Sequence, residues 1–283
     1  MGTSQSSNGS PGGVPMVPPW VPEIPTPPLA EVPEDGTPAE VDPAKSPIAV
    51  PQMPTPMAPA GRFGGARLNL GSYSKSGDRA SMRRGIGQYV RKGYGGSATA
   101  TRRFGRTVQI ANLLHTALSG PIAGNPFTAP GGRLDPSLMS GRSADDVMDA
   151  VVEAIQPVDG TQDAEASRAA IKDALADVLT RFPNADLLNM EDQHRELAIE
   201  RYVAGDVFRR IDLDLGKAIR EKAPNATIGL SRLKEVREYV RETVAAAFRK
   251  LRELGQQIAT GRITQIVQSA LRETLNVFEG YAE

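Results

Sequence analysis

The first group in the chain that could do chemistry is an amine at its start. Removal of Met1 before the small residue Gly2 leaves a free glycine α-amine. Such an amine has a pKa of about 8, so a useful fraction of it is neutral and nucleophilic at cellular pH. The segment Met1-Gly2-x-x-x-Ser6 also matches the N-myristoylation pattern, although from the pattern alone an unmodified terminus is favoured. The residues thus provide an exposed acceptor amine without saying what would modify it.

The other reactive residue types form no convincing centre. There is no cysteine, which excludes disulfides, thiolate zinc sites and cysteine nucleophiles. His115 falls on the apolar stripe of a predicted helix and is expected to be a core histidine, whereas His194 is expected in solvent. Asp212 and Asp214 do not share a helix face at this spacing, so we expect surface charges there. No metal site is predicted.

Catalytic motifs occur only as short strings without their context. The serine–lysine strings lack companion motifs, and the glycine string follows no strand, so it is not a dinucleotide fingerprint. The strings are Ser72-x-x-Lys75, Ser231-x-x-Lys234 and Gly93-x-Gly95-x-x-Ala98. We therefore expect a protein that is not an enzyme and that holds no cofactor.

Residues 71–106, the basic segment, carry the clearest charge signal. Its candidate surface residues are Arg83, Arg84, Arg91, Lys92, Arg102, Arg103 and Arg106. Interleaved aromatic residues suit base stacking beside phosphate neutralisation, and these are Tyr73, Tyr89, Tyr94 and Phe104. The segment therefore suits nucleic acid, or else an acidic surface of a partner or of this chain itself. The two interpretations are equally supported by the composition.

Residues 1–70 predict a disordered tail rich in Pro, Gly and Ser. Roughly 16 of the 23 prolines lie in its first 60 residues, where they prevent a helix or a strand ladder from propagating. The apolar surface is too small to offset the entropy of ordering. Trp20 is the chain's one tryptophan, and within Val17-Pro18-Pro19-Trp20-Val21 it suits either docking in a partner's groove or a role as an incidental linker residue.

Beyond the tail, apolar periodicity and capping residues predict an all-α protein, a helical bundle. We expect a basic helical pair over 71–119, a loop over 120–142 and a helical domain over 143–283, with no strands. The clearest stripe runs through 231–254 in alternating steps of three and four. The expected helices span 79–92, 97–118, 143–155, 161–182, 191–222, 231–254 and 262–278.

Charge is distributed in blocks although the formal net charge is zero. Residues 1–60 carry about −5, residues 61–106 about +10 and residues 107–283 about −5. No apolar run approaches the roughly 18 residues that a membrane span needs, and no secretory signal pattern opens the chain. We expect a cytoplasmic protein that does not bind a membrane.

Three stretches together resemble the QatB family of the bacterial Qat anti-phage operon. They are the start MGTS, the VPPW at 17–20, and the block SGDRASMRRGIGQYVRKGYGG followed by ATATRRFGR. The resemblance lies mainly in the first 120 residues, and the helical remainder fits without being diagnostic. In that operon the family stands beside an ATPase (QatA), a QueC-like enzyme (QatC) and a TatD-like nuclease (QatD), which are the expected partners.

The resemblance implies a use for the terminal amine. A QueC-like enzyme activates a carboxy-deazaguanine with ATP, and in defence operons it is thought to transfer the activated group to a protein's N-terminal glycine. Gly2 would then be the acceptor for a 7-deazaguanine, and the helical body would bind the other operon proteins. Thr3, Ser4 and Trp20 are our candidates for recognition of the partner by the tail. The alternative function is nucleic-acid binding through the basic segment.

Overall fold

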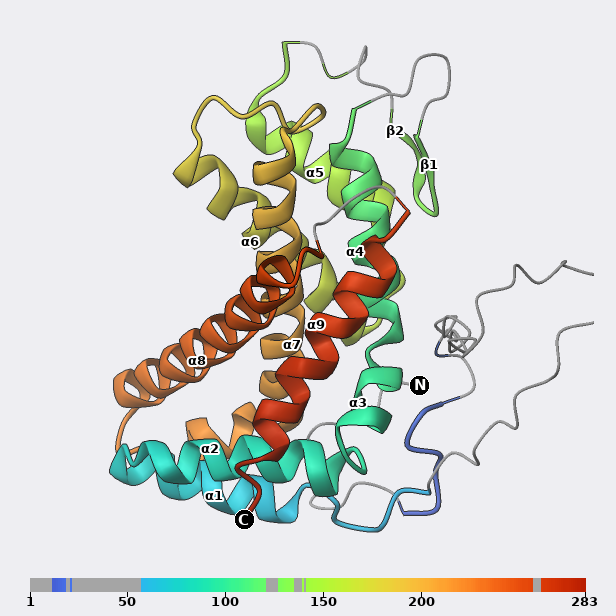
Figure 1. The fold of residues 1–283 in the computed structure, drawn as a ribbon. Coiled ribbons are helices and arrows are strands. Elements are labelled where there is room, and N and C mark those ends of the chain that lie inside the picture. The colour runs from blue at the N-terminus through green and yellow to red at the C-terminus, as the bar shows by residue number, and fades with distance from the viewer. Residues whose placement is uncertain are drawn as a thin grey trace, which may run out of the picture.

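The longest described helix, α7 (Asp192–Lys222), is the central helix, against which four of the other described helices pack (Figure 1). The computed structural model describes residues 12–18, 21, 57–120, 127–134, 139, 141–256 and 261–283. The remaining elements are α1 Gly64–Ser76, α2 Arg79–Gln88, the π-helical turn η1 Tyr89–Gly93, α3 Ser97–Arg103, α4 Gly105–Leu118, β1 Phe127–Ala129, β2 Gly132–Leu134, α5 Ala144–Ile155, α6 Gln162–Arg181, α8 Ala226–Glu253 and α9 Ile263–Glu279. Within the described ranges α6 and α8 lie against α7, α9 and α4 lie beside each other, and α1 and α2 lie side by side across one end.

The expected all-α class is confirmed, and local capping chemistry explains where several helices begin. Asp78 caps α2 by accepting hydrogen bonds from the backbone N–H groups of Ala80 and Ser81, both at 3.0 Å. Ser143 and Asp146 form the expected capping box at the start of α5. These side chains satisfy backbone donors that have no partner inside the helix.

Apolar stripes decide how the helices pack. The stripe predicted for α7 is buried throughout, at Ile199, Val203, Val207, Ile211, Leu215 and Ile219. The stripe of α8 is buried from Leu233 to Leu251, but Leu254 is 66% exposed because the helix ends at Glu253. The periodicity therefore identified a bundle core rather than a free coiled-coil seam.

Two predictions about the first half of the helical body need correction. Helix α1 begins at Gly64, inside the stretch assigned to the disordered tail. The sequence did not predict this helix because its small buried face carries too few large apolar residues. The helix expected over 97–118 is divided at the buried residue Phe104 into α3 and α4. Gly105 follows the break, and glycine has a low helix propensity.

The expected strand-free loop over 120–142 contains a small antiparallel hairpin, β1–β2, with Phe127 opposite Leu134. Gly131 in its turn donates a backbone hydrogen bond to the carbonyl of Ala154 at 2.8 Å. A Cβ at Gly131 would lie 1.9 Å from the carbonyl oxygen of Glu153, so glycine allows the hairpin to approach α5. Sequence alternation could not predict three-residue strands of this kind.

Gly85 and Gly87 weaken α2 as an isolated helix, and the tertiary structure explains their presence. A Cβ at Gly85 would lie 2.8 Å from the side chain of Leu70 on α1. A Cβ at Gly87 would lie 2.6 Å from the backbone nitrogen of Ala282 after α9. Both glycines thus allow α2 to pack closely on its neighbours.

Candidate functional site: the basic segment and the contacts that hold it

The tail residues proposed for modification and recognition lie outside the described residues; these are Gly2, Thr3, Ser4 and Trp20. Within the described part of the tail, Gly13 and Val14 pair with Ala58, which lies shortly before α1, and we call this pairing the tail clip. Gly13 N–H donates to the carbonyl of Ala58 at 2.8 Å, and Ala58 N–H donates to the carbonyl of Val14 at 2.7 Å. The expectation of a tail without structure is therefore wrong at these residues. None of the three is a proline, so Gly13 and Ala58 keep the backbone N–H groups that donate these two hydrogen bonds.

The tail clip limits where the N-terminus can reach. Gly2 lies 11 residues before Gly13. A chain extends by at most about 3.6 Å per residue, so the Gly2 amine stays within about 40 Å of Gly13 in any conformation. In Figure 1 the clipped segment lies near the end of the body where α1 and α3 are found.

Between the tail clip and α1, Phe63 anchors the chain to the basic segment. The Phe63 ring stacks on Tyr89 with a centroid separation of 5.4 Å and meets Tyr94 edge-on at 5.7 Å. The Arg62 guanidinium lies 4.7 Å from the centroid of the Phe63 ring. The exit of the tail is therefore packed on the side chains of η1 and the turn after it.

The predicted surface residues of α2 and η1 face the end of the chain. Arg84 Nε donates to the backbone carbonyl of Glu283 at 3.2 Å, and Arg91 pairs with the Glu283 carboxylate at 3.6 Å. The Arg83 guanidinium lies 5.4 Å from the ring centroid of Tyr281. Part of the basic charge is thus directed to this chain's own C-terminal residues, as one of the two sequence interpretations proposed.

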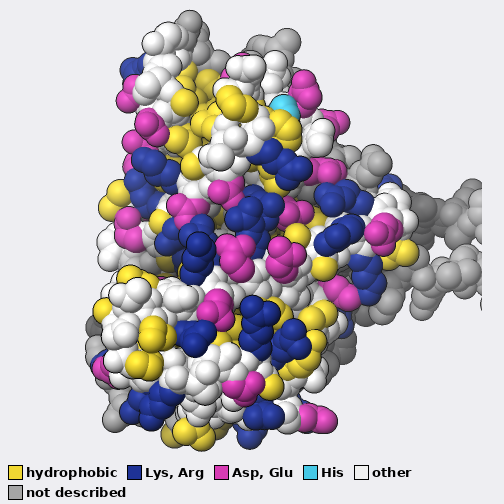
Figure 2. All heavy atoms as spheres, turned by 90° about the vertical axis from the view of Figure 1, so that its left-hand side faces the viewer, with side chains coloured by type: hydrophobic (Ala, Val, Ile, Leu, Met, Phe, Trp, Pro, Cys, Tyr) yellow, Lys and Arg dark blue, Asp and Glu magenta, His cyan; other side chains and the backbone are white. Residues whose placement is uncertain are grey.

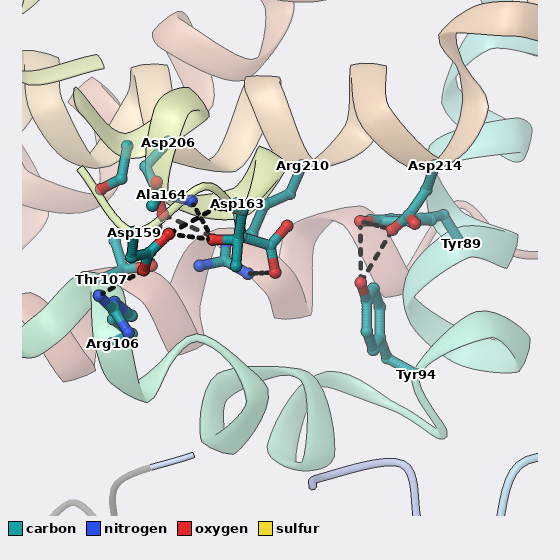
Figure 3. Close-up of polar contacts among 12 residues, drawn as sticks. Tyr89, Tyr94, Arg106, Thr107, Asp159, Asp163, Ala164, Asp206, Arg210 and Asp214 are labelled. Carbon is teal, nitrogen blue, oxygen red and sulfur yellow. Dashed lines mark hydrogen bonds and ion pairs between the residues drawn. The ribbon is translucent and has the colours of Figure 1, made fainter. Parts of the chain in front are cut away.

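The other predicted surface residues are distributed over η1 (Lys92), α3 (Arg102 and Arg103) and α4 (Arg106). Lys92 and Arg102 are exposed, and Arg103 is half-buried. Arg106 donates from Nη2 to Gln156 Oε1 at 3.0 Å and lies 3.7 Å from Asp159 (Figure 3). The basic segment is therefore divided between separate local contacts.

The aromatic residues expected to stack on nucleic-acid bases are interior side chains instead. Their exposed fractions are 0% for Tyr73 and Phe104, 1% for Tyr89 and 4% for Tyr94. Base stacking needs an exposed ring face, so this part of the nucleic-acid prediction is wrong. Each ring fills the core where the basic segment meets the helical domain.

Two of these tyrosines begin a polar seam with α7, in which every residue is buried except the half-buried Asp214 (Figure 3). The seam is formed by Tyr89, Tyr94, Thr107, Asp206, Arg210 and Asp214. The hydroxyls of Tyr89 and Tyr94 each donate to Asp214 Oδ2 at 2.9 Å. Burial raises the pKa of Asp214, although the two hydroxyls act in the opposite direction. Burial also raises the pKa of both tyrosines, so they remain hydrogen-bond donors.

The second part of the polar seam is a buried charge pair. Asp206 is 1% exposed, accepts from Thr107 Oγ1 at 2.6 Å and from Arg210 Nε at 3.3 Å. Arg210 also lies 3.9 Å from Asp163 and stacks over Phe104. Burial acts to lower the pKa of Arg210, but Asp206 and Asp163 outweigh it and raise that pKa. Arg210 therefore stays charged inside the protein.

The polar seam corrects the prediction that Asp212 and Asp214 are both surface charges. Asp212 does pair with Arg220 at 2.6 Å near the surface, but Asp214 faces the tyrosines. Sequence reasoning also missed Asp206 and Arg210. Their i, i+4 spacing beside the apolar stripe of α7 was a usable signal, since it puts a charge pair at the border of the core. Because all its groups are paired, the seam holds the basic segment against α7 rather than offering a reactive group.

The histidines follow the predictions only in part. His115 is buried, and burial lowers its pKa, as expected for a core histidine. His194 is half-buried rather than solvated, because its ring packs on Phe182 with a centroid separation of 4.1 Å. Among the described residues no three His, Asp or Glu side chains are grouped so that they could hold a metal ion.

Comparison with known proteins gives one match. No curated protein and no solved structure matches the chain. Within the part of the chain that the structure describes, no helix is long and apolar enough to cross a membrane. The family model described as Qat anti-phage system associated protein QatB matches residues 95–278. The helical body, which we expected not to be diagnostic, therefore carries most of the family signature. The chain belongs to the QatB family and is a component of the Qat anti-phage system.

Proposed function

We propose that the chain is a non-enzymatic component of this system whose Gly2 amine accepts a 7-deazaguanine from a QueC-like enzyme. Its helical body binds the other Qat proteins, which include the ATPase and the TatD-like nuclease. The observation that carries the proposal is the family match over residues 95–278. The match assigns the chain to the family that the terminal MGTS also resembles, and that resemblance extends the proposal to Gly2.

The chemistry needs little from this chain beyond an accessible amine. The neutral Gly2 nitrogen attacks the activated carboxyl carbon of the deazaguanine, an amide bond forms, and the activating group leaves with a proton lost from the amine. An α-amine pKa of about 8 leaves a useful neutral fraction at cellular pH. Glycine offers no side chain to obstruct a partner's active site.

The tail clip supports a division of labour between tail and body. It joins the tail to the body at Gly13 and Ala58, so that the residues before it form an arm of limited reach. A partner enzyme bound to the helical body within about 40 Å of Gly13 lies within that reach. The body then docks the enzyme and the arm presents the amine.

The test is intact-mass and peptide mass spectrometry of the full chain after co-expression with the QueC-like enzyme. We expect an adduct of the deazaguanine acyl mass on Gly2. Gly2→Glu keeps Met1 in place and should lose the adduct, whereas Gly9→Glu makes the same charge change within the tail and should retain it. A chain that only loses Met1 while the enzyme is active would contradict the proposal.

A second comparison tests the role of the tail clip. Ala58→Pro removes the N–H that donates to Val14, whereas Ala58→Gly keeps it. We expect the proline variant alone to change the rate of modification, because only it removes one of the two hydrogen bonds of the tail clip. Equal rates in both variants would show that the clip has no part in presenting Gly2.

The basic segment gives weaker support to the alternative of nucleic-acid binding, because its aromatic residues are buried and Arg84 and Arg91 contact Glu283. That alternative predicts binding that weakens steeply with salt. Reversing the charge of Arg84 and Arg91 should then abolish it.

A further inference from the structure

A pocket of about 460 Å³ lies away from the basic segment, between the end of α6, the first half of α7 and the second half of α8. We call it the arginine pocket. Figure 2 shows the side of the molecule that is on the left in Figure 1, where Lys and Arg side chains gather across the middle with Asp and Glu among them. The charged residues that line the pocket are Arg181, Arg201, Arg249, Arg252, Glu196 and Glu200.

Cations outnumber anions in the arginine pocket. Arg252 pairs with Glu196 at 3.5 Å, and Arg201 lies 3.6 Å from Glu200. Arg181 and Arg249 are exposed, and among the described residues neither has a carboxylate within ion-pair distance. Two guanidinium groups at the rim therefore remain available to an anion.

Glu200 lies among these arginines and is 7% exposed. Burial raises its pKa, while Arg201, Arg252, Arg241 and Arg249 act in the opposite direction. Four arginines against two glutamates line the pocket, so positive charge is in excess there. An anion is therefore the ligand that this charge balance favours.

We propose that the arginine pocket binds a small phosphate-bearing ligand of nucleotide size. Planar guanidinium groups match phosphate oxygens with paired N–H donors, which makes arginine the residue of choice for such groups. The volume falls within the 300–1,000 Å³ that is usual for small-molecule sites. Phe182 and Leu197 are half-buried and add apolar wall area for the non-phosphate part. The proposal does not depend on modification of Gly2.

Isothermal titration calorimetry of the full chain with pyrophosphate, ATP and adenosine tests this directly. We expect pyrophosphate and ATP to bind and adenosine to give no comparable signal. Arg249→Ala and Arg181→Ala should each weaken binding about tenfold or more, because each removes a charge-assisted contact. Arg272→Ala on α9 makes the same change at an exposed site away from the pocket and should bind as the unaltered chain does.

Glu200→Gln removes one of the two carboxylates and should bind pyrophosphate at least as tightly. Circular dichroism melting curves show whether each variant is folded. Absence of binding by either phosphate ligand, or equal weakening by Arg272→Ala, would overturn the proposal. So would tight binding of a peptide covering the acidic residues 31–42 without any binding of phosphate, since the pocket would then take the chain's own tail.

Discussion

The polar seam and the arginine pocket lie along the same helix, α7, and are built from the same residue types with opposite results. In the polar seam Asp206 and Arg210 are both buried and paired, and Thr107 completes the set. In the arginine pocket the rim arginines are exposed and the carboxylates are too few to match the cations. One region is closed by its own chain, whereas the other leaves charge for a ligand.

The difference shows that burial and pairing, rather than residue type, decide what a charged cluster does. Removing one member of a buried pair leaves the other as a buried charge without a partner or solvent, which lowers the free energy of unfolding. Removing an exposed arginine leaves nothing stranded, because water replaces the contact. Substitutions in the two regions should therefore separate stability from binding.

The largest effect is expected at the centre of the polar seam. Asp206→Ala leaves Arg210 and Thr107 without their buried acceptor and should lower the free energy of unfolding by about 3–5 kcal/mol. Asp212→Ala, which breaks a pair with Arg220 nearer the surface, should cost no more than about 1 kcal/mol. Urea unfolding of both variants measures the difference. Similar losses of unfolding free energy would mean that the pair in the seam stabilises the fold no more than a surface ion pair does.

A smaller loss is expected from one hydroxyl of the seam. Tyr94→Phe removes a donor to Asp214 and should cost about 1–3 kcal/mol of unfolding free energy. Tyr281→Phe removes an exposed hydroxyl and should stay within about 0.5 kcal/mol. If the Tyr94 variant were as stable as the control, the hydrogen bond to Asp214 would contribute nothing net.

The pH dependence of stability should reveal the raised pKa of Asp214. Because its pKa is raised in the folded state, the folded chain holds a proton that the unfolded chain releases above about pH 4. The free energy of unfolding should therefore fall as the pH rises from about 4 through the raised pKa. Asp214→Asn removes this contribution, so its profile from pH 4 to 7 should fall less. Parallel profiles would show that the pKa of Asp214 is not raised in the folded chain.

The smallest effect on stability is expected in the arginine pocket. Arg181→Ala and Arg249→Ala should each change the unfolding free energy by no more than about 0.5 kcal/mol, since both side chains are exposed. The same denaturation series measures it. A loss above about 2 kcal/mol at either position would mean that these arginines hold the fold, and the contrast with the polar seam would disappear.

Much of the fold was predictable because it depends on local signals. Asp78 and Ser143 marked helix starts through capping chemistry, and the stripes of α7 and α8 marked their buried faces. Helix α1 was not predictable in this way, since its close contact with α2 depends on Gly85. The absence of a side chain at Gly85 favours this contact only when the two helices are packed together, which no local sequence signal shows. The hairpin β1–β2 is likewise too short for any alternation to show.

The candidate site was less predictable because its contacts join distant parts of the chain. The basic charge of residues 71–106 was visible at once, but its composition left open whether the aromatic residues among it stack on nucleic-acid bases. Tyr94 reaches Asp214 and Thr107 reaches Asp206 across separations of 120 and 99 residues. No spacing within one helix predicts such a pair, so these long-range contacts remained hidden.

The sequence by itself determined the helical class, most helix boundaries, the charge blocks and the resemblance to the QatB family, because these follow from neighbouring residues and their order. Only the tertiary structure decided which charges are paired and which are left for a ligand. That outcome depends on which helices pack on α7 and on how much solvent they exclude from each part of it. The same arginine and aspartate residues can stabilise a core or line a pocket, and the difference is made by their distant neighbours.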